Sequence, residues 1–285
     1  MTARPWREAV AGGVMPAPVV LVLGGFLTSP PLYRPLVLDL LDRGAADVVV
    51  ARVWTMDWLL AAWRGLGPVL TRSGRALLRA SARSETVALG APVLVVGHSA
   101  GGVSARLLTS PVPFAGRTLN ASGRIGAIVT LGTPHLVAEP ALGRPARGAE
   151  NAQFVNEHVP GPFFAPTTGY LSVASRRRAG RRDGTPGERR TWRGYHFITG
   201  SEDPVIEGDG LIPLASALLP GATSLVFDDA AHGQGIGRDW YGSPRYVDRW
   251  WPLALAAWQG ALAARVERGE GAARGGPGSP AAPAG

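Results

Sequence analysis

A serine, an aspartate and a histidine occur in an order and in local contexts that suit nucleophilic catalysis. Ser99 stands in a Gly-x-Ser-x-Gly pattern, between an apolar run at 92–96 and a helix-compatible segment at 103–108. This is the pattern of a nucleophile elbow, a strand-to-helix turn too tight for side chains two residues away on either side. The turn lifts the serine hydroxyl above the sheet edge and points the first N–H groups of the helix at the reacting carbonyl. The placement of the pattern therefore predicts that Ser99 is a nucleophile.

A serine hydroxyl needs a histidine to take its proton, and the imidazole needs a carboxylate to fix its tautomer. In enzymes with such an elbow, the acid follows the serine in the chain and the histidine follows the acid. His232 comes after all candidate acids, on a loop beyond the last expected strand, and is the predicted base. Asp209, in a Gly-Asp-Gly turn, is the predicted acid, and Asp203, which precedes a proline, is the alternative. His135 is expected to be structural or to line a pocket. The less favoured acids are Glu207, Asp228 and Asp229.

The elements before the elbow must present the serine together with an oxyanion hole. The apolar run 19–23, followed by Gly24 and Gly25, predicts a buried parallel strand and its exit loop. The backbone N–H groups of Phe26, in that loop, and of Ala100, directly after the serine, are predicted to hold the oxyanion. An ordinary strand-to-helix loop is the alternative for this segment.

Strand-like and helix-like segments alternate along most of the chain, which predicts a parallel sheet with helical crossovers. The fold class is therefore α/β, with a mostly parallel central sheet flanked by helices on both faces. The expected helices cover 32–41, 54–63, 69–78, 103–108 and 214–219, with a closing helix within 241–258. The expected strands cover 19–23, 46–53, 92–96, 124–135, 191–199 and 222–227.

Residues 136–191 break this rhythm and are predicted to be a lid or insertion. Its aromatic residues either cover an acyl-binding pocket or pack on the core. Its arginine-rich part, 176–190, is expected to be a disordered or solvent-exposed hairpin tip, with peripheral contact to anions or lipid headgroups as the alternative. Residues 1–268 are expected to form a single domain, and 269–285 a disordered Gly/Ala/Pro tail.

Composition limits the remaining possibilities. With 285 residues, 46% of them hydrophobic, the chain suits one large core. The absence of cysteine excludes disulfides and thiolate metal sites. All 29 basic residues are arginine, so the net charge of +8 fits a coding bias and a solvated surface better than binding to an anionic membrane surface or to nucleic acid. No apolar run is long enough to span a bilayer and 1–15 lacks a secretion signal, so a cytoplasmic location is expected.

Five motifs carry a resemblance to a known family. The chain resembles a lipase-like branch of the α/β-hydrolases, found in cyanobacteria and plant plastids and related to bacterial lipases and to GPI inositol-deacylase-like proteins. The motifs are Gly-His-Ser-Ala-Gly-Gly at 97–102, Leu-Gly-Thr-Pro-His at 131–135, Asn-Ala-Gln-Phe-Val-Asn-Glu-His-Val-Pro-Gly at 151–161, Gly-Asp-Gly-Leu-Ile-Pro at 208–213 and Trp-Tyr-Gly-Ser-Pro at 240–244. The resemblance departs from the family in the arginine-rich stretch at 176–190.

This resemblance implies a minimal α/β-hydrolase that lacks the opening antiparallel strands of larger members. It implies Ser99 as nucleophile, Asp209 as acid and His232 as base in the cleavage of a small-molecule or lipid carboxylic ester through an acyl-enzyme. That chemistry needs no metal and no cofactor. Two alternatives remain open: thioester hydrolysis or acyl transfer by the same triad, and an inactive hydrolase fold that serves as an interaction module.

Overall fold

Six parallel strands form the central sheet of the computed structural model, which describes residues 5–138, 149–237 and 239–274. Their spatial order is β2, β1, β3, β4, β5, β8, and each neighbouring pair runs parallel. The strands are β1 (Val19–Leu23), β2 (Asp47–Val50), β3 (Val93–His98), β4 (Ile125–Leu131), β5 (Gly169–Ser175) and β8 (Thr223–Phe227). Because the carboxyl ends of parallel strands share one edge of the sheet, the loops that follow them meet there.

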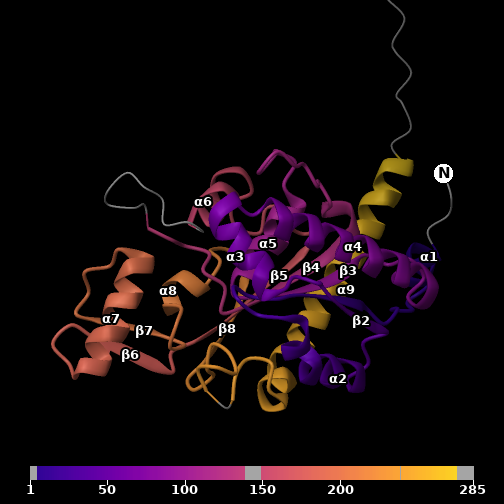
Figure 1. The fold of residues 1–285 in the computed structure, drawn as a ribbon. Helices are drawn as coiled ribbons and strands as arrows, with labels where there is room; N and C mark the ends of the chain where they lie inside the picture. Colours follow the sequence, from indigo (N-terminus) through magenta and orange to yellow (C-terminus); the bar gives the residue numbers. More distant parts are fainter. Residues whose placement is uncertain (1–4, 139–148, 238, 275–285) are drawn as a thin grey trace, which may run out of the picture.

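Helices cover both faces of this sheet (Figure 1). Val20 and Val22 of β1 face a core shared with α1 (Pro5–Ala11), α2 (Arg34–Asp42) and α9 (Pro244–Arg274). The alternate residues of β1 face a second core shared with α3 (Thr55–Arg64), α4 (Gly67–Val87) and α5 (Ala100–Thr109). β1, β3 and β4 are buried along their whole length, which explains their continuous apolar sequences. The predicted fold class, a mostly parallel sheet with helices on both faces, is confirmed.

Two sequence-based expectations about the second half of the chain are wrong. The predicted insertion at 136–191 contains β5, a central strand of the sheet, so the chain leaves the sheet twice, once before β5 and once after it. The predicted strand at 191–199 is the end of helix α7 (Pro186–Thr199). Its aromatic and β-branched residues favoured a strand locally. In the structure, Trp192 and Tyr195, three residues apart, form the buried side of the helix.

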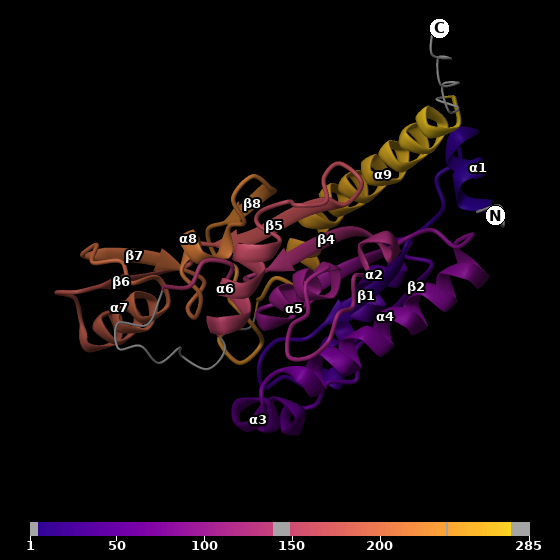
Figure 2. The ribbon, with the colours of Figure 1, turned by 90° about the horizontal axis from the view of Figure 1, so that it is seen from above.

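The excursion after β5 forms a small unit of its own, which we call the satellite unit. It consists of β6 (Arg178–Arg181), α7 and β7 (Val205–Gly208); β6 and β7 pair antiparallel, and α7 packs on them. Figures 1 and 2 both show it at one end of the molecule, beyond the central sheet. Its own apolar cluster is formed by Trp192, Tyr195 and Ile206.

The satellite unit corrects the expectation for 176–190. The arginines are exposed as expected, but the segment is an ordered strand and the first turn of a helix. A capping box at Thr185 and Glu188 begins α7. Gly180 lets β6 pack closely against that helix, since a Cβ on Gly180 would lie 2.5 Å from the backbone nitrogen of Trp192.

The remaining elements complete the described chain. Three short helices lie in connections: the 3-10 helices Pro30–Tyr33 and Ser122–Arg124, and α8 (Leu214–Ala217); α6 (Ala149–His158) packs on α5. Helix α1 has no counterpart among the expected elements, and α9 continues to Arg274, into the predicted tail, of which 275–285 lie outside the described residues. Among the described helices, none has the length and apolar character needed to cross a membrane.

Candidate active site

Ser99 lies on a sharp turn between β3 and α5, with backbone angles of φ 53° and ψ −129°. The flanking glycines are required by the space around them. A Cβ on Gly97 would lie 2.4 Å from the Gly102 Cα, and one on Gly101 would lie 2.1 Å from the Leu23 carbonyl oxygen. Positive φ is costly for a serine, so the packed strand and helix hold this residue in a strained conformation.

The loop after β1 lies directly against this turn. A Cβ on Gly25 would be 2.8 Å from the Ser99 Cβ, so only glycine allows the loop backbone to come this close. The Gly25 N–H donates to the Tyr33 hydroxyl at 2.9 Å. Within the described residues, the backbone N–H groups of Phe26 and Ala100 have no acceptor. Two unengaged donors beside the serine suit the stabilisation of an oxyanion.

Asp209 and His232 form a buried hydrogen-bonded pair. The His232 Nδ1 lies 2.8 Å from the Asp209 Oδ2, and both side chains are almost fully buried. The other carboxylate oxygen accepts the N–H groups of Leu211, at 2.9 Å, and Ile212, at 2.7 Å. Since the carboxylate only accepts when ionised, the proton of the neutral imidazole sits on Nδ1 and Nε2 keeps its lone pair. That is the tautomer a general base needs.

Tyr241 completes the surroundings of the acid. Its hydroxyl donates to the Asp209 Oδ2 at 2.9 Å. Burial and the charge of Asp209 raise the pKa of Tyr241 well above its ordinary value, so its hydroxyl stays protonated as a donor. Gly132, at the end of β4, lies against the same group, because a Cβ there would be 2.7 Å from the Asp209 Oδ2 and 3.0 Å from the His232 Nδ1.

The serine and the acid–base pair are joined through His98, the residue before the serine. Its Nε2–H donates to the His232 carbonyl oxygen at 2.8 Å, and the two rings lie 5.0 Å apart. No hydrogen bond links the Ser99 Oγ to His232 among the described residues; such contacts are often long in enzymes without substrate. The Ser99 N–H donates to the Leu131 carbonyl oxygen at 2.9 Å, and the next residue, Gly132, lies against His232, so the end of β4 also connects the serine with the acid–base pair.

The tautomer of His98 follows from its partners. Because a carbonyl oxygen can only accept, Nε2 carries the proton and Nδ1 accepts the Tyr33 hydroxyl at 2.8 Å. A chain of hydrogen bonds therefore runs from the Gly25 N–H through Tyr33 and His98 to the His232 backbone. Burial, with a smaller contribution from nearby His232, lowers the pKa of His98 to about 3, so this ring is neutral and links two loops.

The satellite unit supports the acid from outside the sheet. The turn that carries Asp209 follows β7 directly, and the Gly210 N–H donates to the Tyr195 hydroxyl of α7 at 2.8 Å. That hydroxyl donates in turn to the Arg178 carbonyl oxygen of β6 at 3.3 Å. The acid is thereby positioned by a helix and a strand that take no part in the central sheet.

Asp203, the alternative acid, and His135 lie elsewhere. Asp203 is exposed and its carboxylate accepts a hydrogen bond from the Ser201 hydroxyl, away from His232. His135 is fully buried, with its Nε2 at 3.0 Å from the Thr130 hydroxyl. Burial and the charge of Arg106 hold the pKa of His135 well below its ordinary value, which fits the structural role expected for it.

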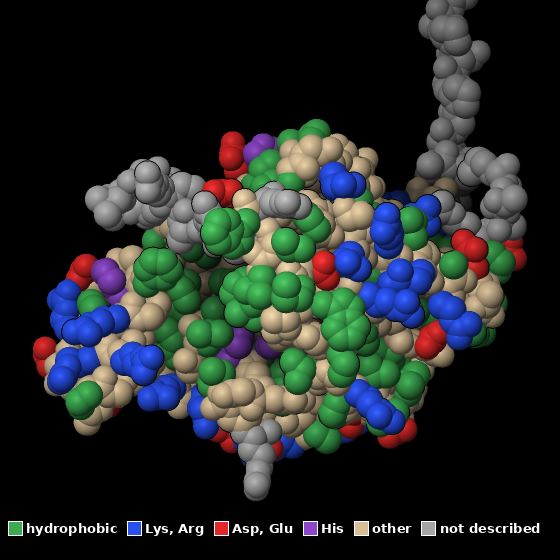
Figure 3. Space-filling view, in the orientation of Figure 1, with side chains coloured by type: hydrophobic (Ala, Val, Ile, Leu, Met, Phe, Trp, Pro, Cys, Tyr) green, Lys and Arg blue, Asp and Glu red, His purple; other side chains and the backbone are tan. Residues whose placement is uncertain are grey.

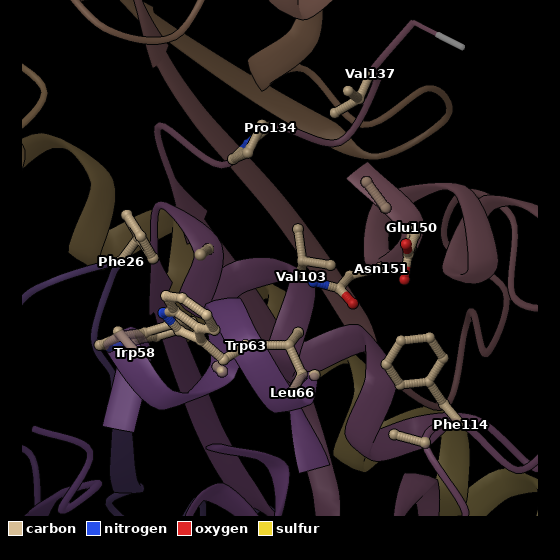
Figure 4. Close-up of a pocket in the computed structure, with 15 residues that line it drawn as sticks. Phe26, Trp58, Trp63, Leu66, Val103, Phe114, Pro134, Val137, Glu150 and Asn151 are labelled. Carbon is tan, nitrogen blue, oxygen red and sulfur yellow. The ribbon is translucent and has the colours of Figure 1, made fainter. Parts of the chain in front are cut away.

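An elongated cavity of about 520 Å³ opens beside the elbow (Figure 4). Figure 4 shows Phe26 and Trp58 on one side of it and Phe114 and Asn151 on the other. Ala100, the residue after the serine, also lines it. Most of the lining is apolar, and its volume is within the ~300–1,000 Å³ that small-molecule sites occupy. The cavity suits an apolar group bound next to the elbow turn.

Sequence reasoning gave no role to four residues of this site: Tyr33, His98, Tyr195 and Tyr241. Tyr241 and His98 lie inside two of the five family motifs. Their polar side chains within those motifs were the signal that could have identified them. Tyr195 was hidden because its segment was expected to be a strand. Nothing in the local sequence marks Tyr33.

Within the described residues, no cluster of three histidine or acidic side chains could hold a metal ion.

Comparisons with known proteins give weak likenesses. No family model and no curated protein matches the sequence. Among solved structures, the esterase Est1E of Butyrivibrio proteoclasticus, with ferulic acid bound, aligns at 12% identity and a TM-score of 0.40, over 86% of this chain and 88% of that chain. Dienelactone hydrolase of Anabaena variabilis aligns at 13% identity and a TM-score of 0.40, over 86% and 87%.

A pyrethroid hydrolase of Sphingobium faniae aligns at 21% identity and a TM-score of 0.29. That alignment spans about half of each protein, 49% of this chain and 51% of the other.

Proposed function

We propose that the chain is a serine hydrolase that cleaves carboxylic esters, with Ser99 as nucleophile, His232 as base and Asp209 as acid. The observation that carries this proposal is the buried Asp209–His232 pair at 2.8 Å, beside a serine held at positive φ on a strand-to-helix turn. A serine hydroxyl is a poor nucleophile unless such a pair activates it, and a carboxylate–imidazole pair fixes the required tautomer.

In this mechanism the His232 Nε2 takes the proton of the Ser99 hydroxyl while Oγ bonds to the ester carbonyl carbon. The negative oxygen that forms is held by the N–H groups of Phe26 and Ala100. Collapse breaks the bond to the alcohol oxygen, which receives the proton from His232, and leaves an acyl group on Ser99. Water, deprotonated by the same imidazole, then releases the carboxylic acid. These steps use side chains and backbone of the protein alone.

The cavity supports an apolar acyl or alcohol group as part of the substrate. It begins at Phe26 and Ala100, whose N–H groups are the proposed oxyanion donors, so a group in the cavity would bring its carbonyl to the serine. Burial of apolar surface of the substrate would supply binding free energy, at about 25 cal/mol for each Å².

We further infer that the chain belongs to the lipase-like branch that its motifs resemble. Four of the motifs meet at the proposed site. The Thr133 hydroxyl of the Leu-Gly-Thr-Pro-His motif donates to the Ser99 carbonyl oxygen at 2.9 Å, and Tyr241 of the Trp-Tyr-Gly-Ser-Pro motif donates to Asp209. Motifs far apart in sequence that converge on one site support a shared chemistry.

Labelling with a fluorophosphonate tests the proposal. The wild type should gain one adduct by intact-protein mass spectrometry and hydrolyse short-chain aryl esters. Ser99→Ala should gain none and lose at least ~10³-fold in rate. Ser104→Ala, a buried serine on the same helix, serves as the matched control and should label normally. Labelling that survives Ser99→Ala would remove the proposed nucleophile.

The same preparation separates hydrolysis from acyl transfer and thioester cleavage. We expect water to be the effective acceptor, so added alcohols should leave the rate of acid release unchanged. A rate of acyl release that rises with the concentration of an alcohol would instead favour a transferase, and preferential cleavage of thioesters over matched esters would favour a thioesterase.

A further inference from the structure

Helix α3 turns an apolar stripe outward. Met56, Leu59, Leu60 and Trp63 follow the i, i+3, i+4, i+7 spacing of one helix face, and their exposed fractions are 64%, 44%, 44% and 84%. The opposite face of α3 already packs on the protein, because Trp58 is buried in the core beneath it. An exposed apolar stripe costs free energy in water and marks a surface that binds something.

The stripe is continuous with the mouth of the cavity. Trp63 lines the cavity while remaining largely exposed. The ring of Phe26, itself half exposed, packs edge-on against Trp58 with centroids 5.7 Å apart. The Thr55 hydroxyl, at the start of α3, donates to the Leu27 carbonyl oxygen at 3.2 Å. Figure 3 shows hydrophobic side chains around the hollow at whose bottom histidines lie.

Helix α4, which packs against α3, carries a ridge of arginines. Arg72, Arg75, Arg79 and Arg83 recur at intervals of three and four residues, and all four are exposed. Arg72 pairs with Asp57 at 2.9 Å and Arg83 with Asp47 at 2.5 Å; Arg75 and Arg79 have no ion pair among the described residues. Figure 3 shows arginines over α4 on the face that carries the apolar side chains of α3.

We propose that this face, the apolar stripe of α3 with the arginine ridge of α4, binds an anionic lipid surface. Apolar side chains next to cationic ones are the composition of interfacial helices, in which the apolar face enters the headgroup region and the cations contact phosphates. The contact is peripheral and brings the mouth of the cavity to the lipid.

The charge pattern disfavours a second copy of the chain as the occupant. A two-fold dimer through this face would place the ridge of one copy near the ridge of the other, and like charges repel. An anionic surface instead complements the ridge along its whole length. The proposal does not depend on hydrolysis, so it can be tested on a protein that cannot turn over.

Flotation with lipid vesicles tests the proposal on full-length Ser99→Ala. We expect binding to vesicles of phosphatidylcholine with phosphatidylglycerol, and at least tenfold weaker binding to phosphatidylcholine alone. Raising the salt from 0.1 M to 0.5 M should weaken the binding, because it screens the arginine contacts. Equal binding to neutral and anionic vesicles, or none to either, would overturn the proposal. Loss of fluorophosphonate labelling by the wild type would touch only the proposed function.

Variants locate the contact. Leu59→Ser with Trp63→Ser should weaken vesicle binding at least tenfold, whereas the control Phe197→Ser, at a 71% exposed site on α7 of the satellite unit, should leave it unchanged. Arg75→Gln with Arg79→Gln should weaken binding about 25-fold, from about fivefold for each arginine. Arg190→Gln with Arg193→Gln, on α7, is the matched charge control. All these side chains are exposed, so thermal stability should not change.

Two outcomes would assign the surface differently and overturn the proposal. Loss of binding in the α7 arginine pair, with α4 variants unaffected, would move the lipid contact to the arginine-rich satellite unit. Concentration-dependent dimerisation of the wild type that Leu59→Ser with Trp63→Ser abolishes would show that a second copy covers the stripe. Vesicle flotation of the arginine variants tests the first outcome, and sedimentation velocity over a hundredfold range of concentration tests the second.

Discussion

The elbow and the satellite unit deliver two parts of one site by different physical means. Ser99 is fixed by backbone: the residues two positions away on either side, Gly97 and Gly101, are glycines because strand and helix backbone pass within a few ångströms of them. Asp209 is fixed by side chains and hydrogen bonds, from Tyr195 on α7 and from Tyr241 before α9. The first region tolerates no added atom, whereas the second rests on separable contacts.

This difference teaches where the site is brittle and where it is adjustable. When a new Cβ in the elbow clashes with the backbone of β1, the strand cannot move away, because β1 is buried along its whole length. The loss of one hydroxyl from a hydrogen-bonded network removes one contact and leaves the others. We therefore expect the same kind of small substitution to act very differently in the two regions.

The largest effect should come from one methyl group in the elbow. In Gly101→Ala the new Cβ would meet the Leu23 carbonyl oxygen at 2.1 Å, so we expect loss of labelling and a fall in the free energy of unfolding of more than ~3 kcal/mol. Gly194→Ala, on α7 where nothing lies within 4 Å, should be neutral or stabilising by up to about 1 kcal/mol. Urea titration measures both. Equal stability of the two variants would break the contrast.

The acid should show a large effect on turnover with little effect on folding. Asp209→Asn keeps the shape of the side chain but favours the wrong imidazole tautomer, so kcat should fall ~10²–10⁴-fold with nearly unchanged Tm. Asp203→Asn is the matched control at an exposed site on the satellite unit and should change kcat less than ~10-fold. The reverse ranking of the two variants would transfer the role of the acid to Asp203.

Removing single hydroxyls around the acid should have intermediate effects. Tyr241→Phe takes away one of the donors to the Asp209 Oδ2, and we expect kcat to fall about tenfold, since a hydrogen bond to a charged group is worth about 1.5–3 kcal/mol. Tyr195→Phe leaves the Gly210 N–H without its acceptor and should cost about 1 kcal/mol of stability with a smaller loss in kcat. If Tyr195→Phe were as damaging to stability as Gly101→Ala, the satellite unit would be as brittle as the elbow.

Acidification should act on stability through His98. The folded protein holds the pKa of His98 near 3, whereas in the unfolded chain it is about 6.5, so the unfolded state binds the proton first as the pH falls. Stability from this group is therefore complete above pH ~6.5 and is lost toward pH 3, by about 1.4 kcal/mol for each pH unit. His98→Asn should flatten the decline of unfolding free energy between pH 6 and 4. An unchanged slope would contradict the buried, neutral state of His98.

Segments with a strong local pattern were the ones that the sequence predicted well. The apolar runs at 19–23 and 93–96 are buried strands, because a parallel strand covered on both faces must be apolar throughout. The Gly-x-Ser-x-Gly turn was recognisable because its steric demands act within five residues. The pairing of Asp209 with His232 was expected from chain order and from the glycines that flank Asp209, and their catalytic roles remain predictions.

Segments without such a local pattern were predicted poorly, among them the central strand β5. β5 carries buried Ser172 and Ser175 and lies between proline-rich and arginine-rich stretches, so its strand pattern was weak. In 191–199 the aromatic and β-branched residues favour a strand locally, but packing on β6 and β7 selects a helix. Long-range contacts such as that of Tyr33 with His98 leave no local trace in sequence.

Helix α9 covers the beginning of β3, the strand that leads to Ser99. The Trp258 indole N–H of α9 donates to the Pro92 carbonyl oxygen at 2.7 Å, directly before β3, and its ring covers Gly126 of β4. A ribosome finishes β3 long before it begins α9, since the chain emerges from its amino end. During that interval one face of the sheet lacks the apolar cover that α9 provides. A messenger truncated before Trp258 would therefore give a chain that aggregates, although it encodes Ser99, Asp209 and His232.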